Sequence, residues 1–152
     1  MNDQEPNIQS LKPIVEKLLK KDGGLAQIAF IIGEENLIAD ISHIEDKDAR
    51  AHLLSDIAKS HHAHKVIFIS SAWMRKVPKS VDPFDLSEEE YNLLEKKEVY
   101  IITEISAKSV VAFMREYSRD ADGKIVFVDD GSEQEIEPMR FKIIQAVLSQ
   151  LH

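Results

Sequence analysis

The chain has 152 residues, of which 43% are hydrophobic, and it contains no cysteine. This length suits one domain with its own core, and the absence of thiols excludes disulfide frameworks, thiol catalysis and thiolate metal sites. The formal net charge of −8 opposes contact with phosphate backbones, so we expect no nucleic-acid partner.

The first half of the chain alternates between helical and extended patterns. Ser10 is the predicted N-cap of a first helix, with Pro13 in its first turn and Asp22-Gly23-Gly24 at its end. Residues 25–32 and 36–41 then form two apolar runs around Gly33, which indicates a β-hairpin. A second helix is predicted over residues 45–62. The predicted apolar sides of the two helices are Ile8, Leu11, Ile14, Val15, Leu18 and Leu19, and Ala49, Leu53, Leu54, Ile57, Ala58 and His61.

The second half begins with residues 65–71, a continuous apolar run typical of a central strand buried on both faces. Residues 72–86 are predicted to be irregular because of their two prolines, and Ser87 is the predicted N-cap of a short helix. Three more strands are predicted, and a last helix with a stripe of apolar residues. The strands cover 98–105, 110–117 and 124–129; the helix starts at Pro138 and carries Phe141, Ile144, Val147, Leu148 and Leu151.

The order of these elements predicts the fold class. Neighbouring strands without helices between them favour an antiparallel sheet, with the helices packed on it. We therefore expect a single α+β domain over residues 1–152, in which a largely antiparallel sheet of about six strands carries three main helices. The strand order does not follow from the sequence.

The only tryptophan, Trp73, follows the predicted central strand. A site at a strand end is typical of such folds, so Trp73, Arg75 and Asp82 are candidate contacts for a ligand or a partner. The alternative is that Trp73 closes one end of the core. Ser70 and Ser71 lie beside it, but no base accompanies them, and no catalytic residue is predicted.

This part of the chain also carries a resemblance. Its residues are Ser70, Ser71, Ala72 and Trp73, followed by Pro78, Ser80, Asp82 and Pro83. They resemble a group of small uncharacterised bacterial and mobile-element proteins, in which a strand ends in a Ser-Glu-Ala-Trp-like motif and a Pro-Ser-x-Asp-Pro-like loop comes next. Ser71 stands where that group has the acid. The resemblance implies no activity.

The histidines form the one concentrated titratable feature. If the second helix persists, His61 and His64 share one of its sides, where two imidazoles and an acid such as Asp129 can hold a divalent cation. The alternative is that both histidines cap the end of the helix. No glycine-rich phosphate loop is present, and no cofactor is predicted.

Without a coherent catalytic set, the sequence favours a non-enzymatic interaction or assembly module that forms a homodimer or a larger homo-oligomer. The alternative is a small ligand-binding protein or metal-dependent enzyme, with a pocket beside Trp73 and residues 72–86. The amino-terminal residues are polar, and no apolar run approaches the roughly 20 residues of a membrane span. We therefore expect a soluble, cytoplasmic protein with no membrane partner.

Overall fold

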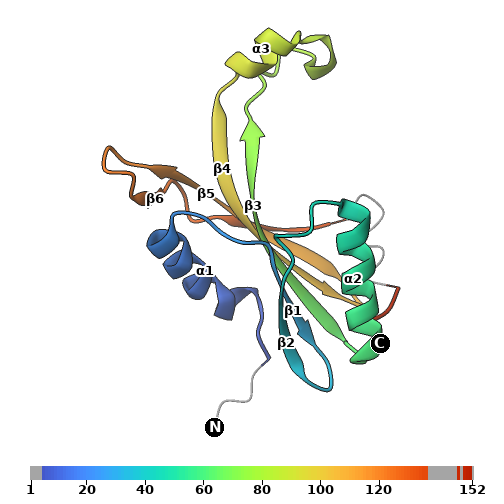
Figure 1. Ribbon diagram of the computed structural model, residues 1–152. Coiled ribbons are helices and arrows are strands. Elements are labelled where there is room, and N and C mark those ends of the chain that lie inside the picture. Colours follow the sequence, from blue (N-terminus) through green and yellow to red (C-terminus); the bar gives the residue numbers. More distant parts are fainter. Residues whose placement is uncertain (1–4, 137–146, 148, 152) are drawn as a thin grey trace.

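The computed structural model describes residues 5–136, 147 and 149–151 (Figure 1). It contains helices packed on one sheet, as the sequence predicts, and they lie on both sides of it. The helices are α1 (Ile8–Asp22), α2 (Lys47–Ser60) and α3 (Glu88–Leu93), with a 3-10 turn, η1, at Pro83–Asp85. The strands are β1 (Ile28–Ile32), β2 (Asn36–Asp40), β3 (Lys65–Arg75), β4 (Lys96–Ser106), β5 (Val110–Arg119), β6 (Ile125–Phe127) and β7 (Ser132–Glu135).

The sheet is antiparallel throughout, in the order β2-β1-β3-β4-β5-β6, which confirms the predicted fold class. β3 pairs with β1 and β4 and is therefore the central strand that the sequence predicts. The short strand β7 pairs with the first part of β5, beside β6. The sequence pattern does not predict this strand: Glu133 and Glu135 look like acids that precede a helix, but they lie on an exposed edge strand.

Each face of the sheet has its own core, because side chains alternate along each strand. Ile67 and Ile69 of β3 pack against α1, on what we call the α1 face. On the opposite face, which we call the α2 face, Val66 of β3 packs with Leu54 of α2. Figure 1 shows the two helices on opposite sides of the strands.

The helix ends differ in detail from the sequence prediction. The N-cap of α1 is Asn7, not Ser10, because the two residues form a capping box in which Ser10 is the third helical residue. Pro13 consequently lies inside the helix and not in its first turn. Of the predicted α1 stripe, Ile14 and Leu18 are exposed.

The buried side of α2 is also shifted from the prediction. Ala51, Leu54 and Ala58 are buried, whereas Ala49 and Leu53 are exposed. The buried residues are spaced three and four apart, so the helix rests on the sheet along a narrower strip, rotated from the predicted one.

β3 is longer than predicted. It continues past Ser71 to Arg75 because β4 pairs with it along its whole length, from Lys65 opposite Ser106 to Arg75 opposite Lys96. The prediction that residues 72–86 are irregular is therefore wrong for residues 72–75. The predicted last helix lies outside the described residues except for Val147, which is helical and buried, and residues 149–151.

No helix in the described part of the chain is long and apolar enough to cross a membrane.

Candidate functional site

The outer parts of β3 and β4 extend beyond both helices as a two-stranded ribbon that ends at α3 (Figure 1). We call residues 73–98 the arm, and residues 76–95, which join its two strands, the tip. Trp73, Arg75 and Asp82, the three predicted contact residues, all lie on the arm. The residues that carry the resemblance also lie here, Ser70 to Trp73 on or next to the arm and Pro78 to Pro83 in the tip.

Arg75 fastens the tip to the end of β3. Its Nη1 atom donates hydrogen bonds to the backbone carbonyls of Leu94, at 2.9 Å, and Asn92, at 3.3 Å. Its guanidinium also lies 5.2 Å from the centre of the Tyr91 ring, within range of a cation–π contact. One side chain therefore joins β3 to the end of α3. Sequence spacing gives no signal for these contacts, since they join residues 16 to 19 positions apart.

Local caps hold the rest of the tip. Asp82 accepts a hydrogen bond from the Phe84 N–H at 3.0 Å and so starts η1. Ser87 and Glu90 form a capping box that starts α3, as the sequence indicates for Ser87. The carboxylate of Asp82 is thus used in a turn, and its role as a direct partner contact stays a prediction.

The tip exposes large apolar side chains. Phe84 is 96% exposed and Leu93 is 85% exposed, and Tyr91 is about half exposed. Trp73, at the base of the arm, is 64% exposed, so it does not close the core. Single exposed apolar residues are common, but aromatic and apolar residues gathered on one projecting element are typical of a contact surface.

A polar cluster lies next to Trp73 at the base of the arm. Trp73 pairs across the strands with Glu98, whose carboxylate accepts hydrogen bonds from the Tyr117 hydroxyl at 2.8 Å and from Arg119 at 3.3 Å. Arg119 also donates to the Gly23 carbonyl at 2.7 Å and so ties β5 to the end of α1. Burial, and then the bond to Glu98, raise the pKa of Tyr117.

A second cluster of the same composition lies further into the sheet. The Tyr100 hydroxyl and the Arg115 guanidinium both donate to the carboxylate of Glu16 on α1. Burial, followed by the bond to Glu16, raises the pKa of Tyr100. In each cluster an arginine balances the charge of a glutamate, and that glutamate accepts a hydrogen bond from a tyrosine. Such paired and bonded groups suit a structural role between α1 and the sheet.

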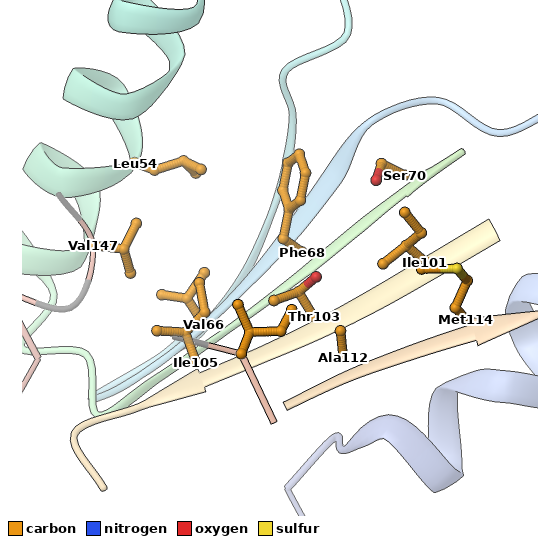
Figure 2. A pocket seen from close by; sticks show the side chains of 11 residues that line it. Leu54, Val66, Phe68, Ser70, Ile101, Thr103, Ile105, Ala112, Met114 and Val147 are labelled. Carbon is orange, nitrogen blue, oxygen red and sulfur yellow. The ribbon is translucent and has the colours of Figure 1, made fainter. Parts of the chain in front are cut away.

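An apolar pocket of about 220 Å³ lies on the α2 face and not beside Trp73 (Figure 2). Phe68, Ile101 and Met114 line one end of it, and Leu54 and Val147 line the other. Its polar side chains are the hydroxyls of Ser70 and Thr103. The lining described suits hydrocarbon groups, and it supplies no charged group for acid–base chemistry.

The three predicted metal ligands occupy separate environments. The N–H of His61 closes the last turn of α2, and the side chain of His64 bonds to Glu5, which lowers the pKa of that carboxyl group. Asp129 accepts a hydrogen bond from the Gly131 N–H in a turn. Among the described residues, no three histidine or acidic side chains gather as a group that could hold a metal ion.

Comparison with protein-family models, with curated proteins and with solved structures finds no match to this chain.

Proposed function

We propose that the chain is a non-enzymatic protein-interaction module that binds a protein partner through the tip of its arm. One observation carries this proposal: the arm projects beyond both helices and presents Phe84 and Leu93 almost fully to solvent. Burying such side chains contributes about 1.5–3 kcal/mol each, and aromatic residues are enriched among those that dominate binding energy.

The charges of the tip indicate the chemistry of that partner. Residues 76–95 contain two lysines, Lys76 and Lys79, against six acidic residues. The Lys76 Nζ atom lies 3.5 Å from the Glu95 Oε1 atom, so these two charges balance each other. The remaining acidic residues share this segment with the exposed apolar side chains. A partner surface that combines apolar and basic side chains complements this composition.

The internal contacts of the tip support the same proposal. Arg75, the two capped helical turns and the pairing of β3 with β4 fix the backbone before any partner arrives. A preorganised surface loses less conformational entropy when it binds, and more of its contact energy appears as affinity.

A photo-crosslinking residue in place of Phe84, activated in the source cells, tests the proposal. We expect one discrete adduct with another protein, and the further change Leu93→Ser should reduce its yield about tenfold, as for a residue worth about 1.4 kcal/mol. The matched control carries the crosslinker at Lys59, an exposed residue of α2. Equal adducts at both positions, or an adduct only with a second copy of the chain, would contradict the proposal.

The alternative function is binding of a small ligand, and we propose the α2-face pocket for it, because the lining residues described there are almost all apolar. A ligand-binding measurement on variants of Phe84 and Leu93 separates the two functions. Substitutions at Phe84 and Leu93 touch none of the residues that line the pocket, and ligand binding there would be unchanged.

A further inference from the structure

The two edges of the sheet are built differently. One edge is formed by β6, of three residues, and by β7, whose sequence Ser-Glu-Gln-Glu is exposed at every residue. Short strands and repeated acids are devices that keep an edge from pairing with another chain. The other edge is β2, with the sequence Asn-Leu-Ile-Ala-Asp, which carries a single charge at its end.

The hydrogen bonds around β2 show which of its backbone groups face outward. The Ile41 N–H donates to the Gln27 carbonyl, and the Gly33 N–H donates to the Glu35 carbonyl. In the β1–β2 register, both pairs belong to the series in which odd-numbered residues bond to each other. Because bonded and non-bonded pairs alternate in an antiparallel ladder, the N–H and C=O groups of Asn36, Ile38 and Asp40 point away from β1.

No strand of the described chain pairs along this outer side of β2. Three residues therefore offer six backbone groups to another extended strand. Ile38, at their centre, is 69% exposed. It lies opposite Phe30 of β1, which packs against the α1-face core, so the edge is apolar on that face.

A second apolar feature lies on the same side of the molecule. Lys12, Glu16 and Lys20 on one flank of α1 contact β5 and β6, through Phe113, Arg115 and Phe127. Ile14 and Leu18 lie on the other flank of the helix, which the strand order places toward β1 and β2, and both are exposed. Exposed apolar side chains thus lie both on β2 and on the flank of α1 that faces this edge.

We propose that a second copy of this chain pairs with β2, so that two β2 strands meet antiparallel and the two sheets become continuous. The proposal is independent of the partner that binds the arm. In the register centred on Ile38, each Ile38 faces the same residue of the second copy, and each Asn36 faces Asp40. This register overlaps the full length of both strands and forms bonded pairs at all three outward residues.

The two other registers that are centred on an outward-facing residue fit less well. Centring the pair on Asp40 would place two carboxylates opposite each other, which is unfavourable, and would leave Asn36 without a strand residue to face. Centring it on Asn36 would oppose Ile38 to the turn residue Glu34. The register centred on Ile38 instead pairs two exposed isoleucines on one face and opposes a neutral amide to each carboxylate.

Single cysteines test this register directly, since the natural chain has no cysteine. Ile38→Cys should form a disulfide-linked dimer under mild oxidation, because bonded antiparallel residues have Cα atoms about 5.5 Å apart. Asn36→Cys and Asp40→Cys are matched controls: each would lie roughly 14 Å from its own copy, too far to link. Mixing the two control variants should restore the crosslink.

Sedimentation analysis of the unmodified chain supplies the second measurement. An interface built on one pair of five-residue strands is small, so we expect a dimer that dissociates on dilution and not a permanent one. Ile38→Pro should leave the fold intact, because the N–H that it removes faces away from β1, but should remove the dimer. The proposal would be overturned if the unmodified chain stayed monomeric at the highest protein concentration measured by sedimentation. It would also be overturned if Asn36→Cys or Asp40→Cys alone crosslinked as fast as Ile38→Cys.

Discussion

Gly33 shows how a single residue decides the position of the β1–β2 hairpin. Its turn packs against the end of α2, where the Glu34 N–H donates to the His61 carbonyl at 3.2 Å. A Cβ atom on Gly33 would lie 2.4 Å from that carbonyl oxygen and 3.0 Å from the Ala63 Cα. Only a residue without a side chain allows this approach, and it places β2 relative to the helix.

We therefore expect Gly33→Ala to lower the free energy of unfolding by about 1–3 kcal/mol, because the backbone of His61 has to move away from the new methyl group. Gly24→Ala is the matched control, since a Cβ atom there meets nothing within 4 Å. It should leave stability unchanged or raise it by up to about 1 kcal/mol, through a less flexible unfolded chain. Urea denaturation compares the two; equal losses would show that the close approach is unimportant.

At the scale of elements, one side chain ties the end of α3 to β3. The carbonyls of Asn92 and Leu94 at the end of α3 accept hydrogen bonds from Arg75. α3 has six residues and buries none of them, so it has little other support. Helices this short are not stable by themselves in water.

Replacing Arg75 with methionine keeps most of the length of the side chain but removes its hydrogen bonds. Bonds to a charged group are worth about 1.5–3 kcal/mol, so amide exchange over residues 88–95 should accelerate roughly tenfold or more. Lys79→Met, in the same tip, removes an exposed charge and should change exchange little. Hydrogen exchange followed by mass spectrometry gives the comparison, and acceleration that spreads through β1 and β5 would contradict a local role for Arg75.

The same elements show what sequence patterns can predict. Apolar runs predict β1 and the central part of β3, and Ser87 predicts the start of α3, because these signals are local. The extension of β3 through Trp73 depends on β4, which pairs with residues 72–75 from 21 or more positions away. β7 has no apolar pattern, and its pairing with β5 forms it. The exposure of Trp73 likewise reflects tertiary position, and no neighbouring residue signals it.

At the scale of the whole molecule, two buried tyrosines, Tyr100 and Tyr117, lie in the core between α1 and the sheet. Tyr100 and Tyr117 are almost fully buried, and both donate to glutamates that arginines balance. Burial and then the nearby carboxylate raise the pKa of both hydroxyls above the usual value near 10. Their neutral forms are therefore part of the folded structure.

This arrangement sets the response to alkaline pH. A pKa raised by folding adds stability that is complete below the unfolded pKa of about 10 and is lost as pH rises toward the folded pKa. Each pH unit above 10 should cost up to about 1.4 kcal/mol for each of these tyrosines. Absorbance at about 295 nm and urea denaturation between about pH 9 and 11 measure the effect. The double variant Tyr100→Phe, Tyr117→Phe should lose this part of the slope; an unaltered slope would refute it.

The arm is made from the two strands at the middle of the sheet, and this gives it a mechanical property. Each strand has 11 residues, so it spans about 35 Å at roughly 3.3 Å per residue. Their inner ends lie between the two cores, and the tip at their outer ends carries Phe84 and Leu93. Any tilt of the tip therefore has to bend the β3–β4 ladder, whose inner part is packed on both faces. The tip is thus joined to the body of the protein by two paired strands and not by a single-chain linker.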